Sequence, residues 1–256
     1  AGLSAWRLLK APADAGASKT MRVGLLVAAV LAPTQAIVGD FHGLNTLEHQ
    51  PAKIAAMEAI WHTEKGVPLV LFAIPNAKTK TNDYAIEIPY GASLILRHDP
   101  NAEVKGLSDF APDHPPVAPV FFAFRIMVGV GVLMIAVSWF AAWVTRRERA
   151  APRWLLWTLA GFTFSGWVAT LAGWIVTEIG RQPWLVAGVL RTSEAVGEIS
   201  PGQLGASLAA YALTYAGMFV AYMVVLTHMA GKGAQAVAPP PETPTPSGAP
   251  LGAAAD

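Results

Sequence analysis

Residues 117–144 read VAPVFFAFRIMVGVGVLMIAVSWFAAWV, and Arg125 is the only charged residue in this run. A transmembrane helix needs about 20 mainly apolar residues, so this stretch is long enough to cross a bilayer. Three other stretches are also apolar. The one at residues 21–38 contains Pro33 and Gln35, which membrane helices tolerate. The sequence therefore predicts an all-α integral membrane protein with four transmembrane helices. The three helices besides 117–144 are expected at residues 21–38, 154–177 and 204–230.

The composition agrees with a membrane protein and excludes several function classes. Of the 256 residues, 54% are hydrophobic and 14% are charged, whereas soluble domains usually carry about 25% charged residues. The formal net charge of +1 gives no electrostatic reason to expect a nucleic-acid partner. The chain has no cysteine, which excludes disulfides, thiolate catalysis and cysteine-ligated iron–sulfur clusters.

The distribution of basic residues predicts the orientation in the membrane. Arginines crowd the short connection 145–153, and basic residues also precede the first span and follow the fourth. Short loops rich in Lys and Arg face the cytoplasm. We therefore expect segments 39–116 and 178–203 outside, and both ends of the chain inside. The segments expected in the cytoplasm are 1–20, 145–153 and 231–256. Residues 1–20 are expected to be the end of a preceding helix and its connection, and 231–256 a disordered Pro-rich tail.

The long outer loop, 39–116, has enough pattern to be partly folded. Residues 51–61 (PAKIAAMEAIW) predict a short amphipathic helix able to lie flat on the membrane interface. Residues 67–74 read as a strand, and 84–90 read as an extended segment after a polar turn. A partly folded extracytoplasmic loop of this length indicates a binding role.

Two groups of polar side chains in or beside the spans are candidates for chemistry, because such groups are costly there. Arg125 in the second span is expected to pair with a carboxylate or with an anionic cofactor group, and the Met127 thioether can serve as an axial haem ligand. Trp174 and Glu178 share a helix face, and Glu178 can bind a metal centre or pair with Arg181. The alternatives are packing and helix anchoring for the first group and an interfacial ion pair for the second.

A third group lies in the outer loop. Lys53 and Glu58 are five positions apart, about 140° around a helix, so they can flank a ligand without touching each other. A carboxylate beside a lysine offers a base and a hydrogen-bond donor, and solvated loop charges are the alternative. All six histidines lie outside the middle of the spans, so this chain alone cannot build a bis-histidine haem site or a haem–copper centre.

Three motifs in order resemble subunit I of the cytochrome bd-type quinol oxidases. They are QPAKIAAMEA at 50–59, FAFRIM at 122–127 and EIGRQPW at 178–184. The resemblance begins at GLSAW, residues 2–6, and covers nearly the whole chain apart from the Pro-rich tail. The short outer loop resembles the cyanide-insensitive branch of that family.

The resemblance implies specific roles for these residues. The segment 39–116 is expected to be the quinol-binding loop, and the cofactors are expected to be a low-spin haem b, a high-spin haem b and haem d. The expected site residues are Lys53 and Glu58 for quinol oxidation, Met127 as axial ligand of the low-spin haem iron, Arg125 close to that haem, Glu178 as axial ligand of the high-spin haem b iron, Trp174 between the haems, and Arg181 near haem propionates.

Family members have further spans before this region, which supply histidine ligands and proton-guiding carboxylates. We therefore expect this chain to be the C-terminal half of the subunit, four helices of a larger bundle, and inactive alone. The expected partners are the missing N-terminal half, subunit II, small accessory subunits, ubiquinol or menaquinol, and dioxygen, in the bacterial inner membrane with the quinol loop periplasmic. A non-catalytic membrane binding or assembly subunit is the alternative, and a transporter is a third reading, which the lack of paired broken helices disfavours.

Overall fold

The computed structural model describes residues 1–195, 197 and 199–231. The chain divides into two compact units, Ala1–Val196 and Gly197–Asp256, which are described separately. As predicted, the fold is mainly helical, and the described residues contain four helical segments long and apolar enough to cross a membrane. These segments are Ala15–His49, Val117–Val144, Arg153–Ile179 and Pro201–Val225.

The first unit begins with helix α1 (Gly2–Lys10) and the long helix α2 (Ala15–His49). The Asp14 carboxylate caps α2 by accepting a hydrogen bond from the backbone N–H of Ala17 at 2.8 Å. The 35 residues of α2 extend about 52 Å at 1.5 Å per residue, more than the hydrocarbon thickness of about 30 Å. Because α2 continues to His49, residues 39–49, which were expected to belong to the outer loop, are helical. The helix ends before Pro51 because a proline disfavours helical backbone in the preceding residue.

Pro33 lies inside α2 and leaves the carbonyl of Ala29, four residues earlier, without its usual helical donor. The indole Nε1–H of Trp139, on the neighbouring helix α5 (Val117–Val144), donates to that carbonyl at 2.8 Å. A span can thus contain a proline because another helix replaces the lost hydrogen bond.

The third span is a broken helix rather than the continuous one that was predicted. It consists of α6 (Arg153–Gly161), a 3₁₀ turn η3 (Phe162–Phe164) and α7 (Ser165–Ile179). The Thr163 and Ser165 hydroxyls donate to the carbonyls of Ala160 and Phe162 at 2.6 and 2.8 Å. Such local side-chain bonds compete with the regular helical pattern, and hydropathy does not reveal them.

The outer loop is folded, and its main element is an antiparallel hairpin. Strands β2 (Leu69–Asn76) and β3 (Thr81–Ile88) pair from Leu69 opposite Ile88 to Asn76 opposite Thr81. Helix α3 (Pro51–Glu58) is buried from Ile54 to Glu58, so it packs inside protein rather than lying on a surface by one face. The other loop elements are β1 (Glu64–Lys65), α4 (Gly91–Arg97), β4 (Glu103–Val104), which pairs with β1, and the 3₁₀ turn η1 (Leu107–Phe110).

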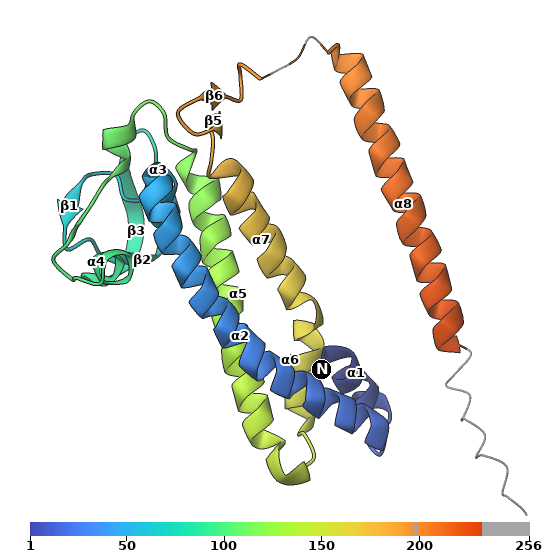
Figure 1. Cartoon of the computed structure of the whole chain (residues 1–256). Coiled ribbons are helices and arrows are strands. Elements are labelled where there is room, and N and C mark those ends of the chain that lie inside the picture. Colours follow the sequence, from blue (N-terminus) through green and yellow to red (C-terminus); the bar gives the residue numbers. More distant parts are fainter. Residues whose placement is uncertain (196, 198, 232–256) are drawn as a thin grey trace, which may run out of the picture. The chain divides into compact units, whose positions relative to one another are not determined.

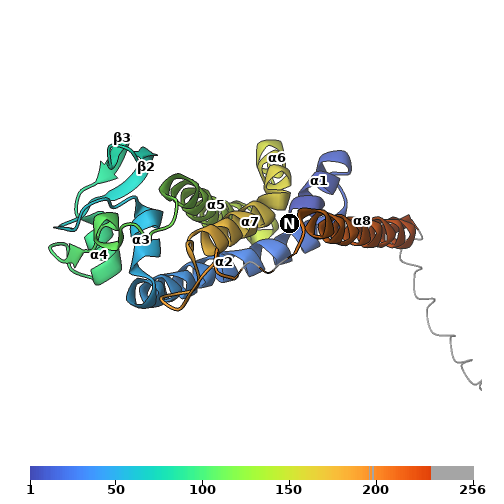
Figure 2. The same cartoon turned by 90° about the horizontal axis from the view of Figure 1, so that it is seen from above.

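Two hydrophobic clusters hold the unit together at opposite ends of α5 (Figure 1). One joins the loop to the start of α5 and includes Ile54, Val120 and Phe121. The other joins α1, α2 and α6 to the far end of α5. Figure 2 shows α3, α4 and the hairpin gathered at one end of the helices. The loop is therefore packed onto the span that carries Arg125 and Met127.

The remaining elements follow the spans. After α5 comes the 3₁₀ turn η2 (Arg146–Glu148), and after α7 come the paired strands β5 (Trp184–Val186) and β6 (Leu190–Arg191). The second unit contains α8 (Pro201–Gly231), which begins three residues before the predicted span. The tail predicted to be disordered lies, beyond Gly231, outside the described residues.

Candidate functional site

A buried ion pair joins the outer loop to the second span. Glu58, the last residue of α3, accepts a hydrogen bond from Arg125 Nη2 at 2.6 Å and a longer one from Nη1 at 3.4 Å. Only 8% of the Glu58 side chain and 17% of the Arg125 side chain are exposed. A fork-shaped contact of a guanidinium with both carboxylate oxygens is a strong and directional interaction. Of the partners expected for Arg125, the structure therefore shows the carboxylate.

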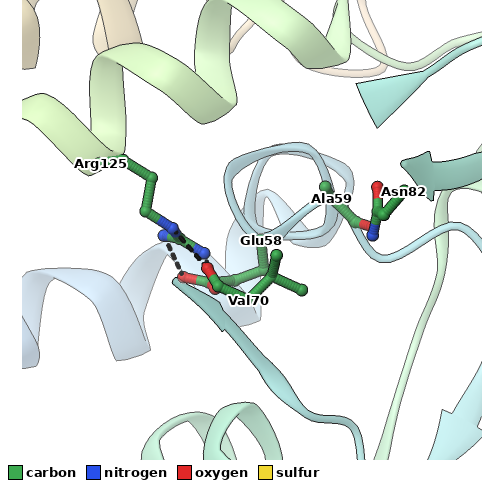
Figure 3. A network of polar contacts seen from close by, with 5 residues as sticks. All are labelled: Glu58, Ala59, Val70, Asn82 and Arg125. Atoms are coloured by element: carbon green, nitrogen blue, oxygen red, sulfur yellow. Dashed lines mark hydrogen bonds and ion pairs between the residues drawn. The ribbon is translucent and has the colours of Figure 1, made fainter. Parts of the chain in front are cut away.

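Arg125 also contacts β2 and two aromatic rings of its own helix. Its Nε donates to the carbonyl of Val70 in β2 at 2.7 Å (Figure 3). The guanidinium carbon lies 4.7 Å from the ring centre of Phe121 and 5.4 Å from that of Phe124, distances at which cation–π attraction operates. Arg125 thus binds α3 and β2 to α5 at one point.

Asn82 on β3 holds the end of α3 and was not predicted as a site residue. Its side-chain nitrogen donates to the carbonyl of Ala59 at 3.0 Å, and its oxygen accepts from Trp61 Nε1 at 2.9 Å. Ala59 has the left-handed backbone conformation that ends α3. The local sequence around Asn82 shows only a polar turn, because its partners lie more than 20 residues away.

A small pocket of about 110 Å³ lies beside Glu58. Its polar lining is suited to water or to the oxygens of a ligand. The carboxylate of Glu58 is therefore buried but next to a polar space. The lining includes Glu58, Trp61, His62, Glu64, Lys80 and Asn82.

Lys53 lies apart from Glu58 and contacts the end of α7. Its Nζ is 3.5 Å from the carbonyl oxygen of Thr177, and its aliphatic chain passes over Gly180. Burial lowers the pKa of Lys53, the positive charge of Arg181 lowers this pKa further, and the Glu178 carboxylate acts in the opposite direction. Lys53 and Glu58 are about 140° apart around α3, so Lys53 contacts α7 whereas Glu58 contacts α5.

Glu178 and Arg181, at the end of α7, form an ion pair with each other. This is the contact that the alternative reading predicted for them. Within the described residues, however, the Arg181 Nε atom is buried without a hydrogen-bond partner. Trp174, one turn before Glu178 on the same face, is 63% exposed. Most of the Trp174 side chain, on the face of α7 that also carries Glu178, is therefore not covered by other described residues.

Met127 lies on the other side of α5 from Arg125, because two residues correspond to about 200° around a helix. Its partly buried side chain points to Gly173 on α7, where a β-carbon would lie 2.8 Å from the Met127 Sδ. Arg125 therefore faces the loop while Met127 faces α7. Sequence reasoning missed Gly173, since a glycine in an apolar helix gives no signal of the contact it makes.

No cluster of three or more His, Cys, Asp or Glu side chains able to hold a metal ion occurs among the described residues. A haem supplies four nitrogens of its own, so it needs only axial ligands from protein. A single thioether or carboxylate side chain is chemically able to fill such a position.

The chain is similar in sequence to curated proteins of known family. The chain is 31% identical over 229 residues to the cytochrome bd ubiquinol oxidase subunit 1 of Bacillus subtilis, a match that covers 84% of this chain and 49% of the relative. It is 27% identical over 305 residues to the cytochrome bd-II ubiquinol oxidase subunit 1 of Escherichia coli, covering 91% of this chain and 58% of the relative. The chain thus spans about half the length of the curated relatives it matches.

A solved structure has the same fold. The bd oxidase from Geobacillus thermodenitrificans is 29% identical in sequence and superposes with a TM-score of 0.80, over 91% of this chain and 54% of that chain. The sequence model of the family described as cytochrome bd terminal oxidase subunit I matches residues 1–234. The resemblance drawn from the three motifs is therefore confirmed, and the chain belongs to the cytochrome bd terminal oxidase subunit I family.

Proposed function

We propose that this chain is the quinol-side half of subunit I of a membrane quinol:oxygen oxidoreductase. The observation that carries the proposal is the buried Glu58–Arg125 pair, which attaches an acid–base group of the outer loop to the span that carries Met127. Relatives named as ubiquinol oxidase subunits support the reaction class. The complete enzyme would oxidise quinol at the outer face of the membrane and reduce dioxygen.

Glu58 and Lys53 are the groups proposed to handle the quinol. Quinol releases two protons when it loses two electrons, so a base must stand beside its hydroxyl groups. Glu58 borders a polar pocket and is oriented by Arg125, and we assign it the role of proton acceptor. Lys53 contacts α7, on another side of α3, and would donate a hydrogen bond to the second oxygen of the quinol ring.

Met127 and Glu178 are proposed as axial ligands of the low-spin and the high-spin haem b. When bound, these haems and haem d supply the electron transfer from quinol to dioxygen. The Arg181 guanidinium, whose buried Nε has no partner among the described residues, is suited to an anionic propionate. Arg125 holds α5 against the loop near the proposed low-spin site, and exposed Trp174 would lie between the haems.

The chain depends on partners under this proposal. The helices that carry Met127 and Glu178, α5 and α7, contain no histidine, so the remaining ligands would come from the other half of subunit I. Subunit II and small accessory subunits would complete the complex, and ubiquinol or menaquinol would be the substrate. The expected location is the bacterial inner membrane, with the quinol loop on the periplasmic side and the C-terminus in the cytoplasm.

The haem assignment is tested by replacing Met127 with leucine in the native complex. We expect the reduced-minus-oxidised spectrum to lose or shift the low-spin haem b band, because leucine has no donor atom. Met134→Leu is the matched control, since Met134 lies two turns further on the same helix and is also partly buried. A low-spin band that is unchanged in Met127→Leu would remove Met127 from the iron.

The quinol assignment is tested by steady-state kinetics of Glu58→Gln and Lys53→Ala. Loss of a general base typically slows a reaction by about 10²-fold or more, so Glu58→Gln, whose amide oxygen can still accept from Arg125, should lower kcat/KM for quinol by that order while the hairpin β2–β3 keeps its protection from protease. Glu103→Gln and Lys105→Ala, two exposed positions of the same loop, should leave kcat/KM unchanged. Normal quinol kinetics in both test variants would remove Glu58 and Lys53 from the quinol site. A complex that shows no haem signals would favour a non-catalytic membrane binding or assembly subunit.

A further inference from the structure

The contact between Met127 and Gly173 is closer than any other side chain at that position would allow. A β-carbon placed on Gly173 would lie 2.8 Å from the Met127 Sδ and 3.8 Å from its Cγ. Favourable contacts between such atoms begin at roughly 3.5 Å. The space that the sulfur occupies therefore exists because residue 173 has no side chain.

Other glycines on the same two helices differ from Gly173. At Gly129 and Gly131 on α5 and at Gly166 on α7, a β-carbon would meet no atom of the described chain within 4 Å. A glycine in a helix interior costs about 1 kcal/mol relative to alanine. At Gly173 this cost is associated with one specific contact, and the contact is with the proposed ligand atom.

We propose that Gly173 is the positioning residue for Met127 and sets where its thioether sulfur lies relative to the low-spin haem iron. The proposal rests on the proposed function, in which Met127 is an axial ligand. Methionine is flexible about three bonds, so a β-carbon at residue 173 would displace the sulfur rather than the helix backbone. Distances from protein ligands to a metal vary by only about 0.2 Å, less than the displacement that such a clash requires.

The test compares Gly173→Ala with Gly166→Ala in the native complex by redox potentiometry and visible spectroscopy. A Met ligand raises the potential of haem iron, so a displaced sulfur in Gly173→Ala should lower the midpoint potential of the low-spin haem and alter its band. The high-spin haem bands should be retained. Gly166→Ala should match the unmodified protein in both readouts.

One further variant separates this inference from the proposed function. If Met127→Leu alters the low-spin haem and Gly173→Ala does not, the role of Gly173 is refuted and the ligand assignment stands. If Met127→Leu changes nothing, both are refuted. If Gly173→Ala fails to accumulate while Gly166→Ala accumulates normally, the β-carbon has disturbed the helix packing rather than moved the sulfur, and the proposal is refuted.

Discussion

Arg125 is a charged residue inside a span, and each of its three guanidinium nitrogens has a protein partner. Two contact Glu58 and the third contacts the carbonyl of Val70. A charge in the hydrocarbon region is tolerated when it is paired in this way. The consequence is that Arg125 and Glu58 depend on each other: removal of either leaves the other buried without a counter-charge.

Replacement of Arg125 by leucine should therefore loosen the outer loop. Breaking a buried ion pair from one side typically costs about 3–5 kcal/mol, whereas replacing both partners by apolar residues costs much less. We expect the hairpin β2–β3 of Arg125→Leu to exchange its amide hydrogens faster and to be cut sooner by protease. The double variant Glu58→Leu with Arg125→Leu should recover most of the protection. Equal loss of protection in the single and double variants would show that the pair does not hold the loop.

At the scale of the element, α2 and α5 share one hydrogen bond that compensates for a proline. Trp139 donates to the carbonyl of Ala29, which Pro33 leaves without a helical donor. Hydrogen bonds between membrane helices contribute about 0.6 kcal/mol on average and up to about 1.7 kcal/mol. Here the bond has a special reason to be strong, because the alternative is an unsatisfied carbonyl inside a span.

A double-mutant cycle tests this compensation. Trp139→Phe should lower the free energy of unfolding in mixed micelles by roughly 1 kcal/mol. In the Pro33→Ala background the same substitution should cost less, because the N–H of residue 33 then satisfies Ala29 within α2. An equal cost of Trp139→Phe in both backgrounds would mean that the proline and the indole act independently.

At the scale of the whole molecule, the predicted topology places the hairpin outside and the connection between α5 and α6 in the cytoplasm. The chain has no cysteine, so single cysteines can be introduced without altering the background. Lys80→Cys, in the exposed hairpin turn, should react with a membrane-impermeant maleimide on intact spheroplasts. Ala150→Cys, exposed in the short connection, should react only after permeabilisation. The reverse labelling pattern would show that the true topology is the inverse of the predicted one.

The sequence alone predicted what depends on local composition and missed what depends on distant contacts. The helix predicted from the apolar run 117–144 has the same bounds in the structure, Val117–Val144. The end of α2 was missed because polar residues such as Asp40 and His42 continue the helix beyond the apolar run, and the break at Phe162–Phe164 was missed because its residues are apolar or small.

The candidate site shows the same division. The motifs identified Glu58 and Arg125 individually, but their pairing joins residues 67 positions apart, which no local pattern contains. Asn82 and Gly173 act only through such contacts. The roles of Lys53, Met127 and Glu178 stay predictions, because they concern groups that other molecules would bring.

The opposite placement of Arg125 and Met127 on α5 also has a genetic consequence. One residue inserted between them would turn every later side chain by about 100° and move it by about 1.5 Å along the helix. Met127 would then leave Gly173 while Arg125 stayed with Glu58. Homologous sequences should therefore accept other apolar residues at the intervening Ile126, whose side chain is 49% exposed in this chain, yet an alignment of functional members should contain no gap between these two positions.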